Sequence, residues 1–290
     1  MRPGNLTGVA LADAEAVGAD LTAAVGRTGR LGVAYSGGVD SATLLALAVR
    51  TLGTDRVVAL LGISPSLAAR ERRSAHDVAQ GIGARVIEVD THEGERPEYI
   101  TNDVDRCFHC KDELFTRIDD DIVTTHDLTA VAYGENADDA ERPDRPGAAA
   151  ATAHRVLRPL ASAGMTKARV REVARSLALP VADKPAAPCL ASRIPHGHAV
   201  TPEKLRQVEQ LEDALAAQGF ADSRVRHHGE IARIEVPGED LARLTDPRVR
   251  EPVLRAGKDA GFRHVTLDLA GLQSGAFTLQ ILNARGSLRA

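Results

Sequence analysis

Residues 34–45 read AYSGGVDSATLL, and this stretch decides the fold. An apolar run, RLGVAYS at 30–36, leads directly into two glycines and an Asp-Ser pair, after which a helical pattern begins. The glycines Gly37 and Gly38 let the backbone turn tightly with no Cβ in the way. Backbone amides and the start of the following helix can then face an anion. The stretch therefore predicts a strand, an anion-binding loop and a helix in immediate succession.

This loop differs from the two common phosphate-binding loops. A Walker A loop needs Gly-x4-Gly-Lys and a dinucleotide fingerprint needs a third glycine, and SGGVDS at 36–41 meets neither pattern. The simpler alternative is an ordinary strand-to-helix turn in which serine and aspartate cap the helix. SGGVDS satisfies more constraints than a cap needs, so we favour the anion-binding interpretation.

The chain around this loop alternates short apolar runs with helical patterns. We predict strands at 56–64, 84–90 and 128–136, and helices at 41–53, 69–83 and 166–178, the last with Thr166 as its N-cap. Strands that alternate with helices of this length imply βαβ crossovers, and hence a parallel sheet covered on both faces. We expect a doubly wound α/β domain over residues 1–190.

The rest of the chain has a different pattern. Residues 201–220 form an amphipathic helical pattern that opens with Thr201 as its cap. RVRHHGEIARIEVPG at 224–238 alternates in the manner of half-buried strands, and FRHVTLDLAGLQSG at 262–275 supplies another strand. We expect a smaller α+β domain over residues 191–290.

Composition excludes several classes of protein. The 290 residues carry a net charge of −4, and no apolar run approaches the roughly 20 residues that span a bilayer. The N-terminus lacks the basic start and apolar block of a secretory signal, so we expect a cytoplasmic location with reduced thiols. A negative balance argues against a protein that mainly coats nucleic acid.

The three cysteines are Cys107, Cys110 and Cys189. The close pair in CFHC, in a reducing compartment, suggests metal binding or thiol chemistry rather than a disulfide framework. Zinc could take all three together with His109 or another histidine, and three unrelated buried cysteines are the plainest alternative. Thiolates are also the usual ligands of iron–sulfur clusters, and three of them leave the fourth iron open.

SGGVDS resembles the pyrophosphate loop of the N-type ATP pyrophosphatases, which include GMP synthetase, NAD synthetase, asparagine synthetase and the tRNA thiolation enzymes. This resemblance implies that ATP activates a carboxylate or carbonyl oxygen as an adenylate with release of pyrophosphate, and that a nucleophile then displaces AMP. It also implies that Ser36, Gly37, Gly38 and Ser41 hold pyrophosphate and that Asp40 lies near Mg²⁺.

Further motifs resemble the LarE family from about residue 20 to residue 278. They are SPSLAARE (64–71), DRCFHCKDELF (105–115), YGENADD (133–139), DRPG (144–147), DKPAAPCLASRIPHG (183–197), SRVRHHGEIARIEV (223–236) and FRHVTLDLAGLQSG (262–275). LarE proteins are ATP-dependent sulfur transferases that convert pyridinium-3,5-biscarboxylic acid mononucleotide into its bisthiocarboxylic form, the precursor of the nickel-pincer nucleotide of lactate racemase. The resemblance implies this substrate and a homo-oligomer built on trimers, including hexamers.

The resemblance offers two roles for the cysteines. In one LarE branch a single cysteine gives up its sulfur and becomes dehydroalanine, and Cys189 matches that cysteine. In another branch three cysteines bind a 4Fe-4S cluster whose open iron carries an extra sulfide, and Cys107, Cys110 and Cys189 match that set. We expect the cluster type, with Cys189 as a catalytic thiol beside Asp40 and Ser36, and with ATP and Mg²⁺ as the other cofactors.

The resemblance also implies arginines that bind the substrate. Arg224 and Arg226 alternate in RVR and so share one face of a strand, and the matching arginines of LarE relatives are associated with the substrate phosphate. Arg193 and Ser192, just after the third cysteine, are further candidate contacts. Without the resemblance, a strand face with two arginines is more often a solvated surface.

Carboxylates and one further arginine complete the candidate site. Glu212, Glu235 and Asp268 could form a cluster near the sulfur site, or each could be an ordinary surface charge. Arg145 in DRPG is a weaker candidate, because the preceding residues ERPD differ from the Asp-Tyr associated with the family.

Two other classes of protein remain open. A tRNA thiolation enzyme would use the same loop and a similar set of cysteines, but it needs an extended basic surface and often extra zinc modules. A nickel or iron storage protein would explain the thiols but would leave SGGVDS without a purpose.

Overall fold

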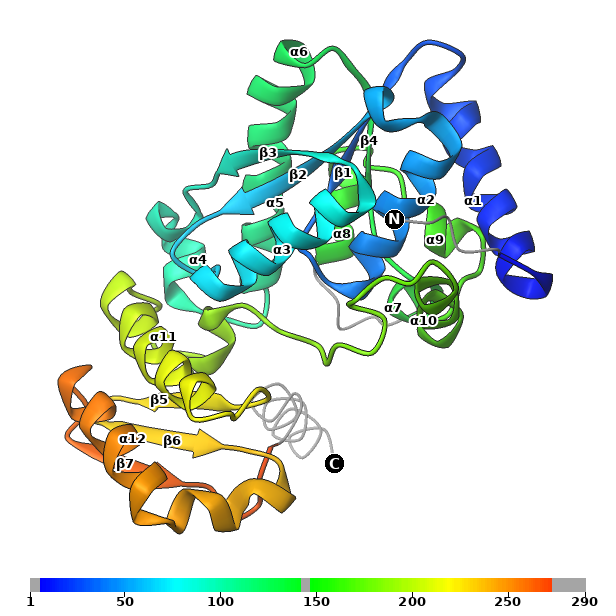
Figure 1. Ribbon diagram of the computed structural model, residues 1–290. Helices are drawn as coiled ribbons and strands as arrows, with labels where there is room; N and C mark the ends of the chain where they lie inside the picture. Colours follow the sequence, from blue (N-terminus) through cyan, green and yellow to red (C-terminus); the bar gives the residue numbers. More distant parts are fainter. Residues whose placement is uncertain (1–5, 142–146, 273–290) are drawn as a thin grey trace, which may run out of the picture. The chain divides into compact units, whose positions relative to one another are not determined.

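The computed structural model describes residues 6–141 and 147–272 (Figure 1). The chain divides into two compact units. The N-terminal unit comprises Met1–Glu93 and Cys107–Ala187, and the C-terminal unit comprises Gly94–Arg106 and Pro188–Ala290. The crossing after Ala187 lies close to the point where the sequence pattern changes. The sequence pattern does not change around Gly94–Arg106, although this segment also belongs to the second unit.

The N-terminal unit is built on a parallel sheet with the strand order β3-β2-β1-β4 among the described residues. Its strands are β1 (Arg30–Ala34), β2 (Val57–Ile63), β3 (Arg85–Asp90) and β4 (Leu128–Tyr133). The chain runs outward from β1 to β3 and then returns to place β4 on the other side of β1. The loop after β1 therefore lies where the strand order reverses, which is the usual ligand-binding position in open α/β sheets.

Helices cover both faces of this sheet (Figure 1). Successive strand residues point to opposite faces, and in β2 Val57 and Ala59 face one core while Val58 and Leu60 face the other. The first core includes residues of α1 (Gly8–Val25), α2 (Val39–Leu52), α3 (Ala69–Ile82) and α10 (Lys167–Ser176). The second includes residues of α5 (Arg106–Arg117), η3 (Ile118–Ile122) and α8 (Gly147–Ala153). The predicted doubly wound α/β fold is confirmed.

Local signals set the ends of these elements. Thr166 caps α10, as predicted, because its Oγ1 accepts the amide of Arg169. Strand β4 stops three residues earlier than predicted, because the amide of Glu135 turns back onto the carbonyl of Tyr133 at 3.0 Å. The remaining elements are η1 (Thr54–Arg56), η2 (Glu93–Glu95), α6 (Val123–Thr125), α7 (Ala137–Ala140) and α9 (Pro159–Ser162). No described helix is both long and apolar enough to cross a membrane.

The C-terminal unit has a smaller mixed sheet. In the described residues its order is β5-β6-β7, with β5 antiparallel and β7 parallel to β6. Its elements are α4 (Pro97–Thr101), η4 (Leu190–Arg193), α11 (Pro202–Ala217), β5 (Arg224–His228), β6 (Ile231–Glu235), η5 (Gly238–Thr245), α12 (Pro247–Asp259) and β7 (His264–Leu267). The predicted N-cap of α11 is present, since Thr201 accepts the amide of Lys204. Strand β5 departs from the half-buried expectation, because its first four residues are all buried.

Candidate functional site

The loop after β1 is held in shape by two serines that contact each other. Ser36 Oγ lies 3.2 Å from Ser41 Oγ, which also accepts the amide of Ser36 at 3.2 Å and donates to the Gly38 carbonyl at 3.1 Å. Gly37 has a φ of +73°, and a Cβ there would lie 2.9 Å from the Cβ of Ala75. The loop therefore gathers two hydroxyls beside the N-terminus of α2, an arrangement suited to a phosphate group.

The end of β4 packs closely against the start of α2. A Cβ on Gly134, directly after β4, would lie 2.7 Å from the amide nitrogen of Ser41 and 2.8 Å from the carbonyl carbon of Asp40. Both neighbours are backbone atoms and cannot swing aside. Only glycine allows this close approach of β4 to the loop, and it explains the glycine in YGEN.

The carboxylate of Asp40 is bound from two sides. Lys167 Nζ lies 2.5 Å from its Oδ2, and Asn136 Nδ2 donates to its Oδ1 at 3.3 Å. Asn136 is itself fixed, because its Oδ1 accepts the amide of Asp139 as the N-cap of α7. The backbone amide of Lys167 donates to Asp138 at 2.8 Å. The Asp40 carboxylate is thus held at the edge of the loop by α10 and by the segment after β4.

A cavity of about 210 Å³ lies against the loop, within the N-terminal unit. Ser36 and Asp40 of the loop line it together with Lys111 and Tyr133. Lys111 Nζ stands 4.4 Å from the centroid of the Tyr133 ring, and its stem passes so close to Gly147 that a Cβ there would meet it at 2.7 Å. The cavity is therefore lined by residues that carry hydroxyls, a carboxylate and an ammonium group.

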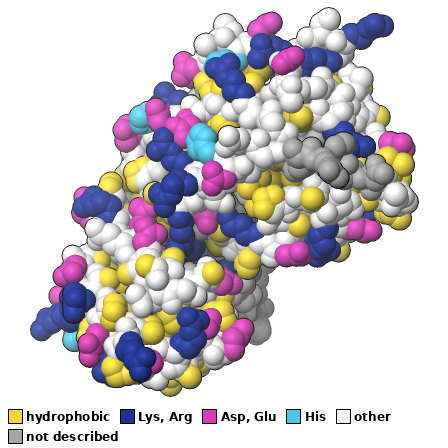
Figure 2. Space-filling model, in the orientation of Figure 1, with side chains coloured by type: hydrophobic (Ala, Val, Ile, Leu, Met, Phe, Trp, Pro, Cys, Tyr) yellow, Lys and Arg dark blue, Asp and Glu magenta, His cyan; other side chains and the backbone are white. Residues whose placement is uncertain are grey.

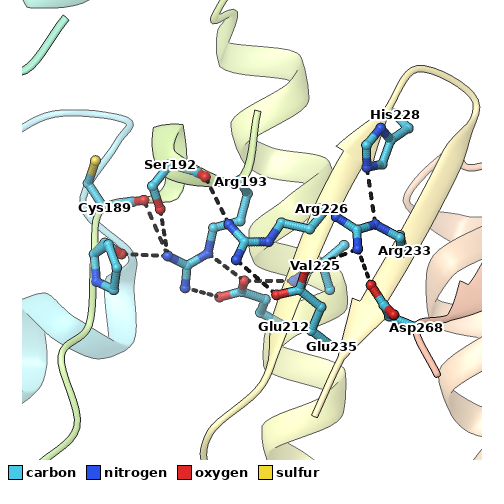
Figure 3. A network of polar contacts seen from close by, with 11 residues as sticks. Cys189, Ser192, Arg193, Glu212, Val225, Arg226, His228, Arg233, Glu235 and Asp268 are labelled. Carbon is cyan, nitrogen blue, oxygen red and sulfur yellow. Dashed lines mark hydrogen bonds and ion pairs between the residues drawn. The ribbon is translucent and has the colours of Figure 1, made fainter. Parts of the chain in front are cut away.

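In the C-terminal unit, the short turn that follows Cys189 is held by two buried arginines (Figure 3). Arg193 donates to the carbonyl of Pro188 at 2.7 Å, to the carbonyl of Cys189 at 3.4 Å and to Ser192 Oγ at 2.9 Å. Arg226, on β5, donates to the carbonyl of Ser192 at 3.1 Å. These guanidinium groups fix the backbone that presents the Cys189 thiol.

The same arginines are paired with buried glutamates. Arg193 makes a two-point contact with Glu212 at 2.8 and 3.2 Å, and Arg226 contacts Glu235 at 2.8 Å. Arg233 extends this chain of contacts from Glu235 to Asp268. Figure 3 shows the arginines and carboxylates in alternation from the Cys189 turn to β7.

This network tests two expectations from the sequence, the carboxylate cluster and the solvated strand face with two arginines. Glu212, Glu235 and Asp268 do lie along one network, but each is paired with an arginine. Arg224 and Arg226 are only 5% and 3% exposed, so they do not form a solvated strand face. Burial, together with the charges of neighbouring arginines, lowers the pKa of Arg224.

The segment Gly94–Arg106 supports the Cys189 turn from its other side. Asn102, fully buried in a left-handed conformation, donates from Nδ2 to the carbonyls of Pro195 and His198 at 2.8 and 2.9 Å. Arg106 donates to Asn102 Oδ1 at 2.5 Å and to the carbonyl of Ala191 at 2.9 Å. This explains why a segment from the middle of the first domain's sequence belongs to the second unit.

None of the three cysteines forms a disulfide, and none is buried. Cys107 and Cys189 are exposed and Cys110 is partly exposed, which contradicts the alternative of three buried hydrophobic cysteines. Cys107 and Cys110 belong to the N-terminal unit and Cys189 to the C-terminal unit. Within residues 6–141 and 147–272, no group of three or more His, Cys, Asp or Glu side chains lies together as a metal site.

Comparison with known proteins connects these features. The NAD synthase family matches residues 18–102, which contain the loop. The chain is 38% identical over 250 residues to an uncharacterized protein of Synechocystis, covering 86% of this chain and 92% of that protein. It is 34% identical over 264 residues to the pyridinium-3,5-bisthiocarboxylic acid mononucleotide synthase of Lactiplantibacillus plantarum, covering 89% of this chain and 92% of that synthase. The chain belongs to the LarE family.

Membership of the LarE family makes the chain a PP-loop ATP pyrophosphatase, and ATP and Mg²⁺ are the cofactors that this family implies. The structure brings Ser36, Gly37, Gly38, Asp40 and Ser41 together around the start of α2. Their individual roles stay predictions, as do those of Ser192 and the arginines. Arg145 lies outside the described residues, and so does the end of the last motif, 273–275.

Sequence reasoning missed several residues of this LarE-type site. Lys111, Asn136 and Lys167 reach the loop or its cavity from three separate elements. Lys111 follows CFHC directly and Asn136 lies in YGEN, so both were inside recognised motifs, whereas Lys167 carried no signal beyond its place after a helix cap. Their convergence depends on the packing of the domain.

Proposed function

We propose that this LarE-family protein is an ATP-dependent sulfur transferase that converts pyridinium-3,5-biscarboxylic acid mononucleotide into its bisthiocarboxylic form. The observation that carries this proposal is the 34% identity, along nearly the whole chain, to the synthase that makes this product. The loop with its cavity and the accessible Cys189 thiol supply the two halves of the chemistry. The product would serve nickel-pincer nucleotide synthesis in the cytoplasm.

The first half-reaction activates a substrate carboxylate. The residues of the loop fit ATP, because two hydroxyls and a helix N-terminus suit the phosphates, the Asp40 carboxylate suits Mg²⁺, and Lys111 adds a positive charge. A carboxylate oxygen of the substrate attacks the α-phosphorus of ATP, a new P–O bond forms, and the bond to the β-phosphate bridging oxygen breaks. Pyrophosphate leaves, stabilised by these donors, and the carboxylate becomes an acyl adenylate.

The second half-reaction transfers sulfur. A sulfur nucleophile attacks the carbonyl carbon of the adenylate, a C–S bond forms, and the C–O bond to AMP breaks. A second cycle on the other carboxylate completes the dithio product. We place Cys189 at this step, since its thiol is exposed on a turn that Arg193 and Arg226 hold in position.

We further propose that Cys107, Cys110 and Cys189 bind a 4Fe-4S cluster. Their chemistry fits, because thiolates are the usual ligands of such clusters, and two of them lie one turn apart on α5. When bound, the cluster would supply exchangeable sulfur at an iron that no protein thiolate occupies. The alternative within the family is that Cys189 donates its own sulfur, so that its Cβ–S bond breaks in a single turnover.

We assign recognition of the substrate phosphate to the arginines of β5. Arg193, Arg224 and Arg226 are all buried, and they lie near enough to one another for the charges of Arg193 and Arg226 to lower the pKa of Arg224. Guanidinium groups pair with phosphates in two-point fashion, and an anion would relieve their mutual repulsion. The glutamates keep the arginine planes in place, and Ser192 lies beside them.

The surface gives no reason to prefer an RNA substrate. Figure 2 shows Lys and Arg side chains interspersed with Asp and Glu over the face that it draws, and the net charge is −4. An RNA-binding enzyme gains most of its affinity from phosphate contacts by basic groups. A small anionic substrate agrees better with the buried arginines.

The proposal is tested by incubating the purified enzyme with ATP, Mg²⁺ and the pyridinium substrate. We expect AMP and pyrophosphate to appear together with thiocarboxylate product, and Asp40→Asn to abolish all three. Pyrophosphate release by Asp40→Asn at the normal rate would overturn the assignment of the loop. Loss of product with retention of AMP formation in Cys189→Ser would separate activation from sulfur transfer.

The cluster is tested independently of activity. Iron, zinc and acid-labile sulfide are measured on anaerobically purified wild type and Cys107→Ala. About four irons and four sulfides per chain, lost in the variant, are expected. Zinc alone would assign the thiols to a structural site, and the absence of any metal would leave Cys189 as a sulfur donor consumed in one turnover.

A further inference from the structure

We propose that Cys107 and Cys110 form a reversible disulfide with each other whenever they carry no metal, so that α5 begins with a redox-sensitive pair of thiols. This inference concerns the two thiols alone. It holds whether or not the sulfur-transfer reaction proposed above is correct.

The geometry of α5 brings the two residues within bonding range. Cys107 and Cys110 are the second and fifth residues of the helix, three positions apart. With a rise of about 1.5 Å per residue and a radius of about 2.3 Å, Cα atoms three positions apart in an α-helix lie about 5 Å from each other. Disulfides span Cα separations of roughly 4.4–6.8 Å, and side chains three positions apart share one face of the helix.

The position of the pair at the start of the helix helps closure. The first amides of a helix have no partner within it, so a disulfide there perturbs fewer intrahelical hydrogen bonds than one in the helix interior. The residues on either side of the pair are anchored. Arg106 donates to Asn102 and to the carbonyl of Ala191, and Lys111 lies between Gly147 and the Tyr133 ring. The two thiols therefore sit on a turn that is fixed at both ends.

Accessibility separates this pair from ordinary cysteines. Free cysteine is usually among the most buried residue types, but Cys107 is exposed and Cys110 is partly exposed. A low-molecular-weight disulfide can therefore reach the pair. Closing a loop of four residues inside one helical turn also costs less chain entropy than pairing either thiol with the distant Cys189.

Glutathione disulfide can oxidise the pair in two thiol–disulfide exchange steps. The Cys107 thiolate attacks one sulfur of the oxidant, which forms a mixed disulfide and releases one glutathione. The Cys110 thiolate then attacks the Cys107 sulfur and releases the second glutathione. The two cysteines lose two electrons to the oxidant, and their two protons end on the released thiols. Reduced glutathione reverses both steps.

The disulfide would act as a reversible switch rather than as a permanent structural bond. A disulfide sulfur is no longer a thiolate ligand, so the oxidised pair cannot bind iron or zinc. Disulfides in the reducing cytoplasm are usually transient and redox-sensing, and exposed ones are the more easily reduced. The pair would therefore protect itself against further oxidation while no metal is present and would open again when thiols are plentiful.

The test uses the full chain, stripped of metal by a chelator and fully reduced. The protein is equilibrated anaerobically with mixtures of reduced and oxidised glutathione, the remaining thiols are alkylated, and the chain is digested with trypsin. Cleavage after Arg106 and Lys111 releases the peptide CFHCK, 107–111, which contains both cysteines of the pair and no other. We expect an unalkylated form that lacks two hydrogens to increase with the share of oxidised glutathione, while Cys189 is alkylated or carries glutathione.

Matched variants sharpen the result. Cys189→Ser should leave the internal disulfide unchanged, and Cys110→Ser should convert Cys107 to a glutathione adduct. Circular dichroism checks that each variant is folded. Glutathione adducts on both cysteines without the internal disulfide, or a crosslink to Cys189 or to a second chain, would overturn the proposal.

Iron uptake then links the pair to the proposed cluster. We expect the reduced protein to take up iron and sulfide, and the oxidised protein to take up neither until a thiol reductant is added. If the reduced protein binds no iron, the cluster proposal fails while the disulfide measurement still stands.

Discussion

Lys167 Nζ lies 2.5 Å from Asp40 Oδ2, so the carboxylate that we expect to bind Mg²⁺ is already paired with an ammonium group. The other carboxylate oxygen, Oδ1, accepts a hydrogen bond from Asn136 Nδ2 at 3.3 Å. The pair keeps Asp40 at the edge of the loop before the nucleotide arrives. We expect Mg²⁺ bound there with ATP to release the ammonium group of Lys167, which could then pair with the phosphates.

Lys167→Gln is therefore expected to slow pyrophosphate release by about 100-fold, because loss of one preorganised donor to a developing charge has an effect of this size. The measurement is pyrophosphate release at saturating ATP and substrate. Lys184→Gln is the matched control, since Lys184 makes a similar ion pair at 2.7 Å, but with Glu71 of α3 rather than with a residue of the loop. Equal rates in the two variants would contradict the role of Lys167.

Lys111→Met is expected to weaken ATP binding by about tenfold, which corresponds to a charge-assisted hydrogen bond of about 1.4 kcal/mol. The physical reason is that Lys111 brings an ammonium group to the cavity that the loop also lines. Calorimetric titration with ATP and Mg²⁺ measures the change. Arg117→Met on the same helix should leave the affinity unaltered, because Arg117 pairs with Glu113 and does not line the cavity.

Gly134→Ala is expected to cost about 1–3 kcal/mol of stability, in the range of overpacked core substitutions. Its Cβ would collide with backbone atoms of Asp40 and Ser41, so β4 or the start of α2 must shift. The shift should also raise the Kd for ATP. Urea unfolding and ATP titration test both effects. Gly81→Ala, in α3 with open space around it, should instead be neutral or stabilising by up to about 1 kcal/mol.

Glu212→Gln is expected to destabilise the C-terminal unit by about 3–5 kcal/mol, since it leaves Arg193 buried without its counter-charge. Both side chains of this pair are at most 5% exposed. The midpoint of urea unfolding gives the change. Glu203→Gln removes the exposed pair with Arg206 and should change stability by less than about 1 kcal/mol. A small effect at both positions would show that the buried pair is dispensable.

The stability of the C-terminal unit should fall as the pH drops from 6.5 towards 4. Burial, aided by the charge of Lys204, lowers the pKa of His227 from 6.5 to about 4. Between these values the unfolded chain binds a proton that the folded chain refuses, so acid favours unfolding, by up to about 3 kcal/mol at the lower limit. Urea midpoints measured across this range test it. His227→Gln should flatten the profile relative to His264→Gln, which alters an exposed histidine.

Much of the loop could be predicted from the sequence because its determinants are local. Two glycines, two serines and an aspartate between an apolar run and a helical pattern leave few alternatives for the backbone. The caps Thr166 and Thr201 were predicted for the same reason, since a cap contacts an amide only a few residues away. Strand β4 was placed correctly, but its end was not, because the chain turns where the amide of Glu135 contacts the carbonyl of Tyr133.

The environment of the arginines could not be predicted. The alternating RVR sequence allows either a solvated face or a buried one, and only the packing of α11 and β6 against β5 supplies Glu212 and Glu235 as partners. The excursion of Gly94–Arg106 into the C-terminal unit is a further example. Asn102 contacts backbone atoms more than 90 residues away, and no local pattern encodes that distance.

The sequence by itself therefore determined the main strands, several of the helices, the anion-binding loop and the identity of the thiols, because each of these depends on short-range geometry and side-chain chemistry. Only the tertiary structure decided which distant side chains meet. Lys111, Asn136 and Lys167 reach the loop through the parallel sheet and its crossover helices, and the Cys189 turn depends on buried charges from β5. These contacts are long-range, and their free energy comes from burial that exists only once the elements have packed.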